Sequence, residues 1–184
     1  MWKHIAYFEL QQGFKRVSVW IYFLVFFGLS FLIANILGGA FTGASIVIGN
    51  QGTSINSPLL IAELQTVFSI FGVLIFAAIF GNAGYRDYET NMHPLFFTKP
   101  VEPSSYFLGR YAGAFSLSLF IQLGITLGLM IGFCMPYLDQ DAIGVFRLDA
   151  YLQPIFIIII PNIFLVGAML FSLAILSRRM LPTY

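Results

Sequence analysis

The sequence predicts an all-α membrane protein that crosses the bilayer several times. Hydrophobic residues make up 59% of its 184 residues and charged residues only 9%, so the chain is more apolar than a soluble domain of this length. Four long stretches contain no Asp, Glu, Lys or Arg, and each could cross the hydrocarbon as a helix of about 20 residues. Strands are a poor alternative, because an apolar strand alone in lipid leaves its backbone groups unpaired.

Residues 1–16 predict a helix that lies on the membrane surface. Apolar residues recur at every fourth position and form a stripe of Trp2, Ala6, Leu10 and Phe14. Trp2 and Tyr7 would then lie at the depth of the lipid headgroups. Ile5 and Phe8 blur this stripe, and a short unstructured leader is the alternative.

The four charge-free stretches predict four transmembrane helices. Their approximate bounds are residues 17–37, 64–84, 111–137 and 150–176. The first is longer than the apolar region of a cleaved signal sequence and three more follow it, so we expect it to stay in the mature protein. Ser57 and Pro58 are expected to open the second helix, as its N-cap and first helical residue. Pro161 should kink the fourth span and free a backbone group for Asn162 to pair with.

The positions of the basic residues predict how the chain is oriented. The N-terminal segment, the central segment 85–110 and the C-terminal segment together contain eight of the nine Lys and Arg residues, and Arg147 is the ninth. Because basic residues concentrate in cytoplasmic loops, both termini and the central segment are expected in the cytoplasm.

Glycines recur along the third span and predict a packing face. They are Gly109, Gly113, Gly124, Gly128 and Gly132. Small residues let a second helix approach closely. We expect that helix to come from the same chain, and a seam between two copies is the alternative.

Motifs for catalysis or cofactor binding do not occur in the sequence. It has no GxxxxGK[ST] phosphate loop, no HExxH and no Cys/His cluster, so we expect no enzymatic activity, no cofactor and no metal in this chain. The single cysteine, Cys134, should be a small buried hydrophobe. Nine scattered basic residues argue against nucleic acid as a partner.

The central segment carries the strongest motif. Six of the seventeen formal charges lie from Arg86 to Arg110. The run YRDYETNMHPLFFTKPVEPSSYFLGRYAGAF, which begins at Tyr85, resembles without a gap the segment between the second and third spans of type-2 ABC exporter permeases. The matching residues are Arg86, Asp87 and Glu89; Leu95, Phe96 and Phe97; Thr98, Pro100 and Val101; and Tyr106, Phe107, Leu108, Gly109 and Arg110.

This resemblance implies a permease subunit whose 85–110 loop docks on a separate ATPase subunit, where ATP and Mg²⁺ bind. The expected docking residues are Arg86, Asp87, Glu89, Leu95, Phe96, Phe97, Thr98 and Pro100. It also implies a second permease copy or half, a bacterial cytoplasmic (inner) membrane and an unidentified exported substrate. Pro94 departs from the family pattern and predicts a break after His93. The family has six spans, so the four predicted here are expected to be the N-terminal part of a longer permease.

Two other functions and a second interpretation of the loop remain open. The chain could be the membrane anchor of a permease fused to an extracytoplasmic zinc aminopeptidase. It could also be a channel or secondary transporter, although Gln122, Thr126 and Asn162 are the few polar groups within the spans that favour this. In the second interpretation of the loop, its aromatic residues enter the headgroup layer and its charges are solvated.

Overall fold

The prediction of an all-α fold is confirmed for the described part of the chain, and its four predicted spans are long, apolar helices. The structure, a computed structural model, describes residues 2–40, 54–89, 103–138 and 143–177, with residues 87–89 as backbone only. The described residues form no strand, and four of their helical segments are long and apolar enough to cross a membrane. The elements are α1 (Trp2–Phe14), α2 (Val17–Leu37), α3 (Pro58–Glu89), α5 (Pro103–Phe133), α6 (Leu148–Pro154), the π-helix η1 (Ile155–Ile159) and α7 (Ile160–Ser177).

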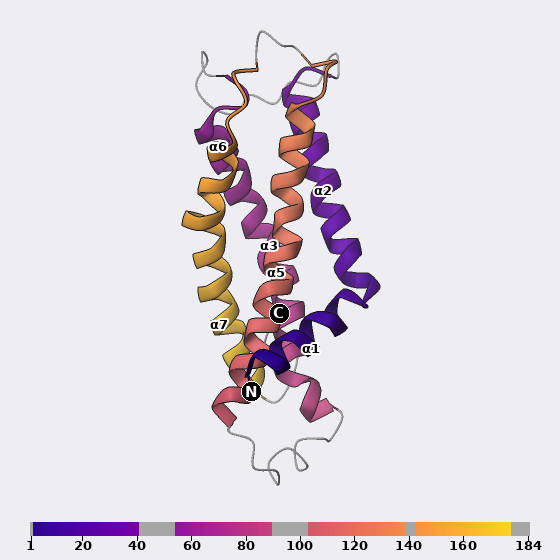
Figure 1. The fold of residues 1–184 in the computed structure, drawn as a ribbon, viewed down its shortest axis with the longest axis vertical. Coiled ribbons are helices and arrows are strands. Elements are labelled where there is room, and N and C mark those ends of the chain that lie inside the picture. The colour runs from indigo at the N-terminus through magenta and orange to yellow at the C-terminus, as the bar shows by residue number, and fades with distance from the viewer. Residues whose placement is uncertain (1, 41–53, 90–102, 139–142, 178–184) are drawn as a thin grey trace.

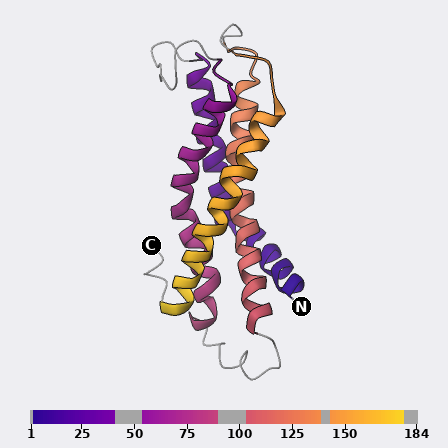
Figure 2. The same cartoon turned by 90° about the vertical axis from the view of Figure 1, so that its left-hand side faces the viewer.

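The spans run alternately up and down, and α5 lies at the centre of the bundle (Figures 1 and 2). It packs against α1, α2, α3 and α7, whereas α3 packs mainly against α7 and α5. α1 crosses one end of the bundle at a steep angle to the spans (Figure 1). We call this end the basic end, because Arg16, Arg86 and Arg110 lie there, and the opposite end the far end.

Two of the spans extend beyond their predicted bounds. α2 has the predicted bounds, but α3 begins at Pro58 and continues to Glu89, and α5 begins at Pro103. The predicted 85–110 loop is therefore helical at both ends. The predicted N-cap of α3 is confirmed, since Ser57 Oγ accepts a hydrogen bond of 3.4 Å from the backbone N–H of Leu60.

The fourth span contains a π-helix between its two prolines, Pro154 and Pro161. Pro161 has no N–H to donate, and the widened turn of η1 immediately before α7 accommodates this break in the hydrogen-bond ladder. The prediction for Asn162 is wrong: its Nδ2 donates to Ser69 Oγ of α3 at 2.6 Å and not to a backbone group. A buried amide in an apolar span pairs with the nearest side-chain acceptor, and the sequence did not place Ser69 there.

The five glycines of α5 lie against two helices of the same chain. A Cβ added at Gly109 or Gly113 would lie within 2.7 Å of atoms of Ile5 or Glu9 in α1. Gly124, Gly128 and Gly132 face α2 in the same way, with Phe23, Ser30 and Ala34 as neighbours. The missing side chains thus allow α5 to contact both helices closely.

One prediction about a surface residue is wrong. Cys134 is exposed rather than buried, because α5 ends one residue before it. The predicted helix at the N-terminus is present, and Ile5, Glu9 and Gly13 face α5. Trp2, at the start of the predicted stripe, is exposed, which fits a residue at headgroup depth.

Candidate functional site

At the basic end, one carboxylate joins two arginines from different helices. Glu9 Oε1 of α1 lies 3.1 Å from Arg86 Nη2 of α3 and 3.2 Å from Arg110 Nε of α5. Arg110 is buried, and its guanidinium also lies over the ring of Tyr106. Charge-assisted hydrogen bonds of this kind are stronger than neutral ones, and partial burial protects them from solvent screening. The cluster therefore holds α1 against both helices.

Close packing of α1 on the glycines of α5 makes this arrangement possible. Glu9 lies one turn after Ile5, and both contact α5 where it has only glycine. Without side chains at Gly109 and Gly113, the helix axis of α1 comes close enough for a glutamate to reach α3 as well. The glycine contacts thus determine where the carboxylate of Glu9 lies.

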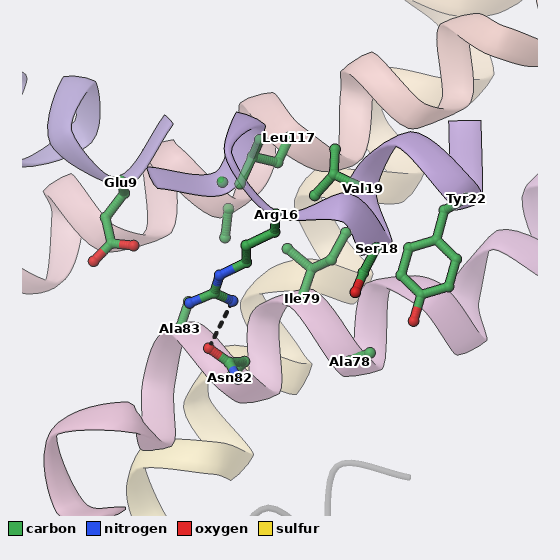
Figure 3. A pocket seen from close by; sticks show the side chains of 12 residues that line it. Glu9, Arg16, Ser18, Val19, Tyr22, Ala78, Ile79, Asn82, Ala83 and Leu117 are labelled. Carbon is green, nitrogen blue, oxygen red and sulfur yellow. Dashed lines mark hydrogen bonds between the residues drawn. The ribbon is translucent and has the colours of Figure 1, made fainter. Parts of the chain in front are cut away.

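A pocket lies beside this cluster, between the start of α2 and the last turns of α3 (Figure 3). It has a volume of about 250 Å³ and twelve lining residues, among them Glu9, Ser18, Tyr22 and Ala114. Arg16 crosses it, with Nη1 donating to Asn82 Oδ1 of α3 at 3.1 Å. This contact shows that the start of α2 is level with Asn82, so the last seven residues of α3 extend beyond α2.

The predicted docking residues fall into two groups. Arg86 is part of the Glu9 cluster, and Asp87 and Glu89 belong to the last turn of α3. The others lie outside the described residues: Leu95, Phe96, Phe97, Thr98 and Pro100. The structure does not describe His93 and Pro94 either, so the predicted break there stays a prediction.

Inside the bundle, polar side chains follow one side of α5. Ser118, Gln122 and Thr126 are spaced four residues apart and are at most 5% exposed. Gln122 lies over α3 at Gly72, where an added Cβ would be 2.9 Å from its Oε1. Because α3 and α5 are antiparallel, Gln65 lies two turns further toward the far end. We call Gln65, Ser118, Gln122 and Thr126 the polar seam.

Each member of the polar seam has at least one atom without a hydrogen-bond partner among the described residues. These atoms are Gln65 Oε1, Ser118 Oγ, both amide atoms of Gln122, and Thr126 Oγ1. The Gln65 nitrogen donates to the backbone oxygen of Tyr151, whose own hydroxyl is also without a described partner. A buried polar group left unsatisfied costs roughly 1–3 kcal/mol, so such a concentration needs an explanation.

The seam separates the two apolar clusters of the bundle. One cluster, with Phe26, Phe68 and Ile121, fills the space between α2, α3 and α5. The other, with Phe76 and Ile163, lies between α3, α5 and α7. Sequence reasoning noted Gln122 and Thr126 but missed Ser118 and Gln65; the spacing of four from Ser118 to Thr126 was the available signal.

The comparisons with known proteins give no family for this chain. No protein-family model, curated protein or solved structure matches it. Within the described part of the chain, no three His, Cys, Asp or Glu residues form a group that could hold a metal ion. The basic end and the seam are therefore the two features of the chain that bear on its function.

Proposed function

We propose that this chain is the permease subunit of an ABC exporter and that an ATPase subunit docks on the segment between α3 and α5. The expected site is the cytoplasmic face of a bacterial inner membrane, at the basic end. The chain would bind no ATP itself and would work with a second permease copy or half. Its substrate is not specified by this proposal.

The observation that carries the proposal is the extension of α3 and α5 beyond α2 at the basic end. α3 has 32 residues and α2 has 21, which correspond to roughly 48 Å and 32 Å of helix. The hydrocarbon core is only about 30 Å thick, so α3 can cross it and still project by several turns. A docking segment at the tip of two such helices would be accessible to a soluble partner.

The Glu9 cluster supports a mechanical role for these projecting helices. Glu9 joins α1 to α3 through Arg86 and to α5 through Arg110, the two helices on either side of the segment 90–102. A force applied at the tip would then move α3, α5 and α1 together, which is what a coupling element requires. The negative charges of Asp87 and Glu89 would orient the partner, while the predicted apolar residues anchor it.

The test is co-purification with the ABC ATPase encoded beside this chain, with reversed charges at the tip of α3. We expect Asp87→Lys combined with Glu89→Lys to abolish co-purification and to remove stimulation of the ATPase activity. Arg86 is left unchanged, because it pairs with Glu9 and its loss would also weaken the helix frame.

The matched control reverses a charge at the far end. Arg147→Glu changes an exposed residue that pairs only locally, at 2.6 Å with Asp149, and should leave assembly unchanged. If the Asp87/Glu89 double variant assembles and stimulates as well as this control, the docking proposal is wrong. The anchor and channel alternatives both predict that equality.

A further inference from the structure

The polar seam contains more hydrogen-bonding capacity than its protein neighbours use. Gln122 offers two N–H donors and one carbonyl acceptor, and neither amide atom has a described partner. Ser118 and Thr126, one turn on either side, each add a hydroxyl that also has no described hydrogen-bond partner. All three side chains face the interior of the bundle rather than lipid, since each is at least 95% buried.

The pocket at the basic end comes within one helical turn of the seam. Ala114, one turn before Ser118 on α5, lines the pocket beside the Glu9 cluster, and so does Leu117. On α3 the pocket extends to Ala78 and Ile79, about two turns from Gly72, which lies under Gln122. Water that enters the pocket is therefore one helical turn from the first hydroxyl of the seam.

We propose that the polar seam is an internal binding site for water, filled from the pocket at the basic end. The side chains of the seam carry no formal charge. Their two amides and two hydroxyls match the donors and acceptors of water. Water bound at Ser118, Gln122 and Thr126 would satisfy the atoms that the protein leaves unpaired. It would also extend the aqueous phase into the middle of the bundle.

The absence of a side chain at Gly72 fits this role. Gln122 Oε1 occupies the space that a Cβ would need there, so the amide is held between the two helices and not folded back along α5. On both sides of the seam the packing is apolar, and water confined there has partners only along the seam. The proposal does not depend on an ATPase partner, because the site lies within one chain.

Thiol accessibility tests the proposal on the purified full chain in lipid nanodiscs. The background is Cys134→Ser, and single cysteines replace Ser118 or Gln122 in the seam, or Ile121 or Ile125 as controls. Both isoleucines are fully buried on the same helix at the same depth and belong to the apolar cluster near α2. Because only the hydrated thiolate reacts, a small water-soluble methanethiosulfonate should modify the seam cysteines at least about tenfold faster than the controls.

Equal rates at all four positions would overturn the proposal, whether all are slow or all are fast. A second measurement uses the wild-type chain and so requires no substitution to fold. In a sample labelled with ¹⁵N-glutamine, the side-chain amide protons of Gln122 should show magnetisation transfer from water, with the signal assigned by its loss in Gln122→Leu. Transfer from protein protons alone would contradict a water site.

Discussion

A single residue, Glu9, determines how α1 is attached to the rest of the protein. Its carboxylate is shared by Arg86 and Arg110, which are 77 and 101 residues away in sequence. Arg110 is 2% exposed, so loss of Glu9 would remove one carboxylate from a buried guanidinium. The energetic role of Glu9 is therefore larger than that of a surface ion pair.

We predict that Glu9→Gln destabilises the protein by about 3 kcal/mol, as expected when one partner of a buried ion pair is removed. Glutamine keeps the shape and one acceptor but loses the charge. Thermal unfolding in nanodiscs measures the effect. Asp149→Asn is the matched control, because the same chemical change is made in an exposed pair and should leave the unfolding temperature nearly unchanged. Equal losses in the two variants would contradict the role of Glu9.

At the scale of elements, the sequence predicted the helices well and their ends poorly. Apolar runs located all four spans, and the Ser57 cap located the start of α3. The predicted second span ends before Arg86 and the third begins after Arg110, yet both arginines lie within helices, where Glu9 pairs with them. Such pairing depends on tertiary contacts over many residues, and no local pattern reveals it.

The same limit applies to the interior. Polar residues in the spans were visible in the sequence, but their gathering into one seam depends on the rotation of α3 against α5. Gly72 packs against Gln122. In the sequence it is an isolated glycine in an apolar run, which does not reveal the residue that packs against it. Only Gln122 and Thr126 of the seam are named from the sequence, and the arrangement of the four residues depends on the fold.

The α2–α5 contact provides a prediction with an internal control. A Cβ at Gly128 would collide with Ser30 Oγ and lie 2.5 Å from the backbone oxygen of Phe27, whereas nothing lies within 4 Å of a Cβ at Gly28. Gly128→Ala should therefore cost roughly 1–3 kcal/mol through overpacking. Gly28→Ala should be neutral or stabilise by up to about 1 kcal/mol, because alanine is the better helix former. Thermal unfolding of both variants, in the same lipid, measures the difference.

The reverse order of stability would show that the α2–α5 packing is not the one described. A loss of stability in both variants would point instead to a partner helix against Gly28, on the side of α2 that faces open space in the single chain. The pair of substitutions thus separates packing within the chain from packing between chains.

At the scale of the whole molecule, the distribution of charge and the direction of the helices agree. Arg16, Arg86 and Arg110 lie near α1 at one end of the bundle, and Arg147 directly precedes α6. α1 and α6 are at opposite ends (Figure 1). An alternating four-span bundle necessarily brings the first, third and fifth segments to one side. The positive-inside rule then predicts that the basic end faces the cytoplasm.

Cys134 allows this orientation to be tested in the unmodified protein. It is the only cysteine of the chain and is exposed at the far end, just after α5. A membrane-impermeant maleimide added to intact spheroplasts should label it, since the far end is expected outside. In the Cys134→Ser background, a cysteine at the exposed Ser104 of α5 should be labelled only after the membrane is permeabilised. The opposite pattern would invert the orientation and place the proposed docking segment where no cytoplasmic ATPase could reach it.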